Sequence, residues 1–103
     1  MDNRELLELA AKAAAIDPGY GAVRQGDFGL EFYGGGNRMT WNPLEDDGDA
    51  LRLAVKLQMS VTVGLLSAIA ETRLGMVKCD EGEIDGATRR AIVLAAAEIG
   101  KRM

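Results

Sequence analysis

The sequence predicts an α+β fold with a layered α/β/α arrangement, in which about three helices pack on a small, mainly antiparallel sheet. Apolar residues recur at helical spacing in three segments, at the start, in the middle and at the end of the chain. Between these segments, apolar and polar residues alternate with the period of two that is typical of strands. A chain of 103 residues has room for one hydrophobic core, so we expect residues 1–103 to form a single domain.

The first helix is expected over Asn3–Ala15, where NRELLELAAKAAA consists of strong helix formers. Leu6 and Ala10 lie on one face of this helix at a spacing of one turn. We expect the helix to stop at Asp17–Gly19, because a residue before proline is disfavoured in the α region and glycine allows a reversal. Tyr20–Gln25 is then an irregular entry to the first strand.

A β-hairpin is expected next. Phe28–Tyr33, FGLEFY, alternates as a half-buried strand does. Gly34–Asn37 forms the turn in this interpretation, and Arg38–Trp41 pairs back as the second strand. Three consecutive glycines could also suggest a phosphate-binding loop. However, GGGN lacks the Lys and Ser/Thr of a P-loop and the spacing of a dinucleotide fingerprint, so the pattern favours a turn.

The second helix starts within WNPLEDDGDALRLAVKL, and the sequence allows two starting points. In the first, Asn42 caps the helix, Pro43 takes the first helical position and Glu45 returns a hydrogen bond to the cap. In the second, Asp47 or Asp49 is the cap and the preceding residues form a loop. Carboxylates are favoured in the first turn by the helix dipole in both versions, so these acids need no ligand to explain them.

The apolar residues of this second helix have an amphipathic pattern. Leu44, Leu51 and Val55 lie on one face at helical spacing, with Leu53 and Leu57 beside it. A stripe of this kind is the one that a helix normally turns toward the core.

The segment after this helix is predicted to contain antiparallel strands. Met59–Val63 alternates as a strand, and Leu65–Ala70 can be read either as a strand or as a short helix. Thr72–Lys78 alternates again, and we expect it to run antiparallel to the strand before it.

The last helix is expected over Ala87–Arg102, with Ala91 and Ile92 on its apolar side. The acidic connection Cys79–Gly86 precedes it, and Asp85 is the best candidate for its N-cap. Arginine and lysine at the C-terminal end suit the helix dipole.

Composition excludes several classes of enzyme. The chain contains no histidine, which removes serine–histidine and cysteine–histidine catalysis, histidine acid–base chemistry and zinc sites with imidazole ligands. Its single cysteine, Cys79, cannot build a thiolate zinc site, and nothing nearby in the sequence would activate it as a nucleophile. No catalytic residue and no cofactor is therefore predicted.

Charge and cysteine content indicate the setting in which the protein works. Twelve basic and sixteen acidic residues give a net charge of −4, which disfavours binding to nucleic acid. The lone Cys79 cannot form an internal disulfide, which favours the cytoplasm. The start MDNRELLELAAK does not resemble a signal peptide, and the apolar run Val61–Ala70 is shorter than the roughly 20 residues of a membrane helix.

One segment is a candidate binding site. Trp41 and Asn42 stand beside a turn and a helix start, and Asp46, Asp47 and Asp49 follow within a few residues. A tryptophan next to free helix N–H groups can line a pocket for a small ligand, and carboxylates can hold a divalent metal. Against a metal, the alternating spacing and the distal glutamate of an EF-hand are missing. The competing interpretation makes Trp41 a core anchor under the hairpin.

Three stretches resemble one group of proteins: WNPLEDDGDALRLAVKLQMSV in the centre, ATRRAIVLAAAEIGKRM at the end and NRELLELAAKAA near the start. Together they cover more than half of the chain, and they are similar to small phage and prophage proteins of the phage ABA-sandwich domain type. The segments Gly19–Arg38 and Gly64–Ile84 take no part in this resemblance. The resemblance implies a layered α/β/α architecture and expression in a bacterial cytoplasm, and it implies no catalytic residues.

These observations leave a preferred function and several alternatives. The preferred one is a non-enzymatic binding or interaction protein of accessory or anti-defence type, which engages a host or phage protein or assembles into a homo-oligomer. The alternative is a small-ligand or divalent-metal binder that uses Trp41–Asp49. A carboxylate-based hydrolase would need paired acids at a defined separation. A DNA mimic would need the acids of Glu45–Asp49 and Asp80–Asp85 on one face.

Overall fold

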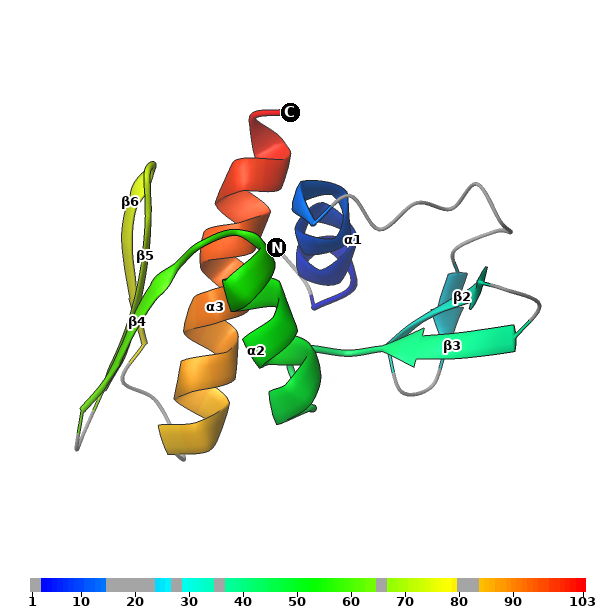
Figure 1. Ribbon diagram of the computed structural model, residues 1–103, viewed down its shortest axis with the longest axis horizontal. Coiled ribbons are helices and arrows are strands. Elements are labelled where there is room, and N and C mark those ends of the chain that lie inside the picture. The colour runs from blue at the N-terminus through cyan, green and yellow to red at the C-terminus, as the bar shows by residue number, and fades with distance from the viewer. Residues whose placement is uncertain (1–2, 15–23, 27–28, 35–36, 65–66, 80–83) are drawn as a thin grey trace.

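The computed structural model describes residues 3–14, 24–26, 29–34, 37–64, 67–79 and 84–103. The predicted α+β class is confirmed, with three helices and with helices packed on a three-stranded antiparallel sheet (Figure 1). The elements in chain order are α1 (Asn3–Ala13), β1 (Arg24–Gly26), β2 (Gly29–Gly34), β3 (Asn37–Trp41), α2 (Asp47–Lys56), β4 (Ser60–Val63), β5 (Ala68–Thr72), β6 (Gly75–Cys79) and α3 (Ile84–Lys101).

The helix α3 stands in the middle of the molecule. The sheet β4–β5–β6 lies on one side of it, and α1 and α2 lie on the other (Figure 1). The strands β1, β2 and β3 form a second antiparallel sheet at the opposite end of the molecule, so the six strands among the described residues make two sheets rather than one. The molecule is accordingly elongated, with extents of 41 × 26 × 23 Å.

The predicted hairpin is confirmed as β2 and β3, in which Leu30 pairs with Trp41 and Gly34 with Asn37. The irregular entry predicted over Tyr20–Gln25 is wrong at its end, because β1 begins at Arg24 and pairs antiparallel with β2. A three-residue strand is too short for its alternation to be visible in the sequence, and its pairing with β2 defines it.

The sheet β4–β5–β6 differs from the prediction in its middle strand. The strand interpretation of Leu65–Ala70 is correct for Ala68–Ala70, and this strand continues to Thr72. The chain then turns at Arg73 and Leu74, where the Thr72 hydroxyl accepts a hydrogen bond from the Leu74 N–H at 3.1 Å. Gly75 follows with φ +125, a conformation that residues with a side chain rarely adopt. The predicted strand Thr72–Lys78 is thus divided, because Thr72 ends β5 and β6 begins at Gly75; β6 runs antiparallel to the strand before it, as expected.

Close packing of α1 on α3 forms the centre of the core. The two helices run in the same direction, since Asn3 accepts a hydrogen bond from Arg90 and Lys12 donates one to the carbonyl of Met103. Their buried surfaces consist largely of alanine, and Gly100 lies directly against the backbone of Leu9. Small side chains of this kind let two helix axes approach closely. The buried hydrophobic residues on these helices, together with Ala14 directly after α1, are Leu6, Leu7, Ala10, Ala11, Ala14, Ala87, Ala91, Ile92, Val93, Ala95, Ala96, Ala97 and Ile99.

The helix α2 buries a different face from the one that the sequence predicted. Ala50, Leu53 and Ala54 are in the core, whereas Leu51 and Val55 are 64% and 68% exposed. Two apolar stripes lie side by side on this helix, one of Leu51 and Val55 and the other of Ala50, Leu53 and Ala54. The second stripe packs on α3, because its alanines permit a closer approach. The expectation that Leu51 and Val55 face the core is therefore wrong.

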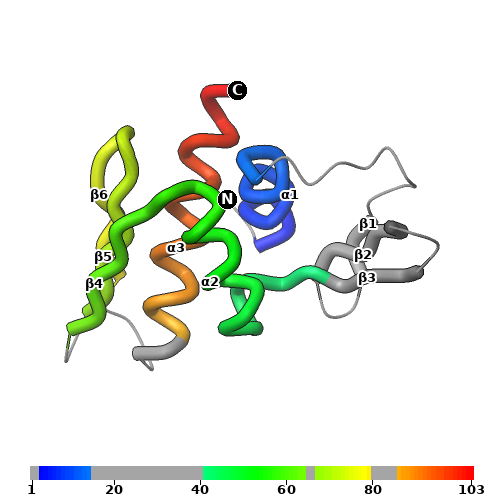
Figure 2. Tube along the Cα trace, in the orientation of Figure 1, coloured from blue at the N-terminus to red at the C-terminus, as the bar shows by residue number. Residues whose placement is uncertain are grey.

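The end of α2 directs the chain into β4. The N–H of Gln58 donates to the carbonyl of Val55 at 3.1 Å, and the N–H of Met59 donates to that of Ala54 at 2.9 Å. Gln58 itself is left-handed, with φ 54. These are the bonds of a Schellman motif, here without its usual glycine. As Figure 2 shows, the trace leaves the end of α2 and crosses α3 to reach β4 on its other side.

Other predictions concern helix ends. The helix α3 begins at Ile84, so Asp85 lies inside the helix and is not its N-cap. The stop at Asp17–Gly19 lies outside the described residues, as do Asp80–Glu83 of the acidic connection.

Over the described ranges, none of the helices combines the length and the apolar character that crossing a membrane requires.

We expect Gly100→Ala to destabilise the protein by about 1 to 3 kcal/mol, because the added Cβ would overlap the Leu9 carbonyl and backbone atoms cannot move aside. Gly86→Ala in the same helix is the matched control, since its Cβ would lie 3.9 Å from the nearest atom, on Arg89. That control should leave stability unchanged or raise it by up to about 1 kcal/mol. Urea unfolding measures both, and equal midpoints for the two variants would contradict this packing.

Candidate functional site

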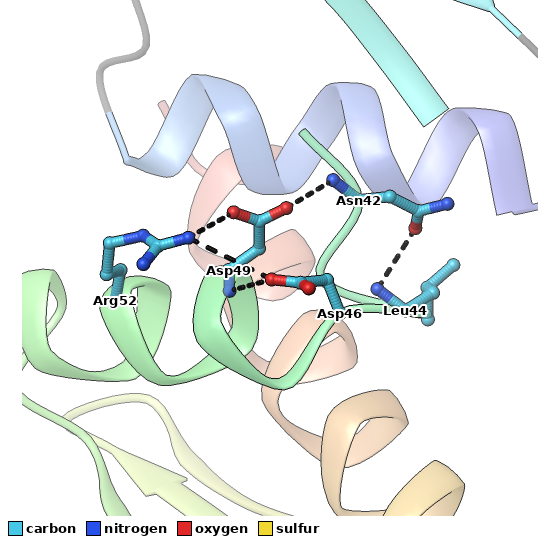
Figure 3. Close-up of polar contacts among 5 residues, drawn as sticks. All are labelled: Asn42, Leu44, Asp46, Asp49 and Arg52. Atoms are coloured by element: carbon cyan, nitrogen blue, oxygen red, sulfur yellow. Dashed lines mark hydrogen bonds and ion pairs between the residues drawn. The ribbon is translucent and has the colours of Figure 1, made fainter. Parts of the chain in front are cut away.

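The acidic segment before α2 forms a network that starts the helix (Figure 3). Asp46 is the N-cap, in extended conformation, and its Oδ2 accepts a hydrogen bond from the N–H of Asp49 at 2.7 Å. This satisfies one of the four N–H groups that a helix start leaves without a partner. The later of the two predicted starting points is therefore close to the structure, although the cap is Asp46 and not Asp47 or Asp49.

Asn42 organises the turn that precedes this cap. Its Oδ1 accepts from the N–H of Leu44 at 3.1 Å, and its carbonyl accepts from the N–H of Asp46 at 2.9 Å. The N–H of Asn42 in turn donates to Oδ2 of Asp49 at 2.9 Å. The side chain of Asp49 is only 14% exposed, and its other oxygen accepts from Arg52 at 2.6 Å. Asp49 thus ties the end of the hairpin to the first turn of α2 (Figure 3).

Asp47 points to a different partner. Its Oδ1 accepts from the guanidinium of Arg89 on α3 at 2.6 Å, and Nε of Arg89 donates to the carbonyl of Leu44 at 2.9 Å. The Arg89 side chain is 18% exposed, whereas that of Asp47 is 77% exposed. One arginine therefore fastens both the turn and α2 to α3. Sequence reasoning did not single out Arg89, because no local pattern shows a contact across 45 residues.

Trp41 is 8% exposed and belongs to the hydrophobic core. The structure thus brings together Asn42, Asp46 and Asp49 of the predicted site, turns Asp47 toward Arg89 and buries Trp41. Within the part of the chain that the structure describes, no group of three or more His, Cys, Asp or Glu side chains is placed to hold a metal ion. What the network does physically is fix the position and direction of α2.

A second feature is a surface that the sequence analysis did not single out as a site. We call it the α2/β4 surface, and it comprises Leu51, Val55, Val61 and Val63. These residues are 64%, 68%, 37% and 59% exposed. Leu51 and Val63 line the same shallow depression of about 220 Å³, which has Ala50 and Ile92 among its other lining residues and the Asp47–Arg89 ion pair beside them.

The strand β4 is an edge of its sheet. Within the described residues, β5 is the only strand that pairs with it, and all four residues of β4 are exposed. Natural edge strands are usually protected by charges, proline or bulges, because their unpaired N–H and C=O groups can recruit another strand. The sequence of β4, SVTV, contains no charged residue and no proline, whereas the opposite edge strand, β6, carries Lys78.

A scan of protein-family models and searches of curated proteins and of solved structures found no match to this chain.

Asp49→Ala is expected to lower stability by about 1 to 2 kcal/mol, because it removes the acceptor of the Asn42 N–H and the partner of Arg52. Asp47→Ala removes a carboxylate that is largely in solvent, so a change within about 0.5 kcal/mol is expected. Urea titrations followed by tryptophan fluorescence compare the two. If Asp47→Ala proved the more damaging, the role given to Asp49 would be wrong.

Arg89→Met and Arg90→Met form a second matched pair. The first should cost about 1 to 2 kcal/mol, because the partly buried Leu44 carbonyl loses its donor. The second removes only an exposed contact of 3.4 Å with Asn3, and its effect should stay within about 0.5 kcal/mol. Thermal unfolding distinguishes them, and the same melting temperature for both variants would refute the fastening role of Arg89.

Proposed function

We propose that this protein is a non-enzymatic binding protein, which adds a strand of another protein chain to the edge of β4. The observation that carries this proposal is the combination of an unprotected edge with an apolar surface beside it. The backbone of β4 offers hydrogen bonds to an incoming strand, and the side chains of the α2/β4 surface offer it apolar contacts. The two kinds of contact lie next to each other, since Leu51 of α2 and Val63 of β4 share one depression.

Energetics support this use of the surface. Burying a valine or leucine side chain that was exposed contributes about 1.5 to 3 kcal/mol, so several such residues together can sustain an interface. A monomer gains nothing from exposing them. Clustered exposed apolar residues mark contact surfaces more often than scattered ones do, and here they gather on two consecutive elements.

The acidic segment has a supporting part in this proposal. Asp46 and Asp49 set the start of α2, and Arg89 holds it against α3, so the orientation of Leu51 and Val55 is fixed before a partner arrives. A preformed surface binds more tightly than one that must be ordered on contact. The resemblance to small phage and prophage proteins supports a partner in the bacterial cytoplasm, as for an accessory or anti-defence protein.

Affinity capture from a bacterial lysate tests this function, with the tagged protein as bait. Leu51→Glu with Val55→Glu keeps good helix formers on α2 but places charges in the interface, so the protein partners held by the wild type should be lost. Met76→Glu is the control, because Met76 is 67% exposed but lies on β6. The control should retain the partners. If all three baits capture the same proteins, the α2/β4 surface is not the binding surface.

A further inference from the structure

We infer that the strand which β4 accepts is β4 of a second copy of this chain, paired antiparallel about a two-fold axis centred on Thr62. This inference rests on the proposed function, and it names the partner chain that the proposed function leaves open. It follows from the faces on which the β4 side chains lie, from the symmetry of Val61–Thr62–Val63 about Thr62 and from the distribution of charge.

The register of the sheet assigns each β4 residue to a face. Val61 pairs with Ala70 and Val63 with Ala68, and both alanines are completely buried. Val61 and Val63 therefore lie on the face of the sheet that α3 covers, because paired residues of an antiparallel ladder share a face. Thr62 pairs with Ile69 and lies on the opposite face. Since α3 packs chiefly over β5 and β6, the two valines are left partly in solvent.

Symmetry then limits how two copies of β4 can pair. Two identical strands that pair antiparallel in one sheet are related by a two-fold axis perpendicular to that sheet, so each residue meets one on its own face. With the axis at Thr62, Val61 meets Val63 of the second copy, Val63 meets Val61, and Thr62 meets its own equivalent. Cross-strand pairs of β-branched residues and of threonines are favourable. Valine therefore meets valine on the face that α3 covers, and threonine meets threonine on the opposite face.

The helix α2 completes this arrangement. Leu51 lies beside Val63 across the shared depression, and Val55 follows Leu51 one helical turn later. A strand added to the edge of β4 extends the sheet on the side that α3 leaves open, so its inward valines meet the exposed stripe of α2. In a two-fold dimer each copy covers the valines of the other in this way, and all four residues of the α2/β4 surface become buried.

The strand β4 can meet a second copy without bringing like charges together. Each chain carries a net charge of −4, which opposes self-association, so two copies associate most easily where the contact itself contains no charged side chain. The strand β4 provides such a contact, as it has no ionisable side chain, and the nearby Asp47 is neutralised within its own chain by Arg89. The other edge, β6, would bring Lys78 of each copy into the interface. The edge of β4 is therefore better suited to a second uncharged β4 strand than to a charged strand of another protein.

Sedimentation velocity of the full chain over a wide range of concentration tests this inference. The wild type should form a dimer. Thr62→Lys, which would place two ammonium groups opposite each other on the axis, should raise the dimer dissociation constant at least about tenfold. Thr62→Glu should do the same. Met76→Lys on β6 is the control and should dimerise as the wild type does.

An equimolar mixture of Thr62→Lys and Thr62→Glu should restore the dimer, because the opposed charges then attract. This mixture tests the register itself, and circular dichroism of each variant establishes that it is folded. A wild type that stays monomeric at every concentration, or a Thr62→Lys variant that dimerises normally, would overturn the inference. So would a mixture that stays monomeric. None of these results bears on the lysate capture, so a different partner at the same surface would still be found there.

Discussion

The close approach of α1 and α3 is the constraint on which the remaining structure depends. Alanines fill most of the contact, and Gly100 permits the backbone of Leu9 to touch α3 directly. Because α1 and α2 pack on one side of α3, the sheet β4–β5–β6 packs on its opposite side. This accounts for a last helix that is buried on several sides rather than along one stripe. Small residues make such crowding possible, because each neighbour can lie within a short distance of the α3 axis.

The same constraint explains why one surface is left uncovered. The completely buried Ala68 and Ala70 of β5 draw α3 over the centre of the sheet, and α2 packs on α3 through its alanine-containing stripe. Neither helix then fully covers the inner face of β4, so Val61 and Val63 are partly in solvent, and Leu51 and Val55 of α2 remain largely exposed. The carboxylates at the start of α2 help to hold this helix in place, because they bind backbone N–H groups and arginines within the chain. The exposed apolar surface is therefore a direct result of how the core is packed.

The sequence predicted the features that depend on local patterns. The three helices, the β2–β3 hairpin and the strand at Ser60–Val63 follow from periodicity and turn residues. What it could not predict depends on contacts between distant residues. On α2 the side chains of Leu51 and Val55 are larger and more apolar than those of Ala50 and Ala54, and only the fit of the two alanines against α3 accounts for the face that is buried. In the candidate site, the helix-start chemistry was readable, whereas the contact between Arg89 and the Leu44 carbonyl was not. The exposure of β4 likewise became visible only with its neighbours in place.

The central claim is that the edge of β4 receives β4 of a second copy of this chain, and amide hydrogen exchange resolved by residue tests it most directly. Exchange should be followed in β4 and in β6, at protein concentrations well below and well above the midpoint of assembly. The account predicts that the amides of Val61 and Val63, whose N–H groups point away from β5, exchange more slowly as concentration rises because they become paired, while those of Gly75–Cys79 keep the same rates. Exchange in β4 that is independent of concentration, or slowing confined to β6, would contradict it.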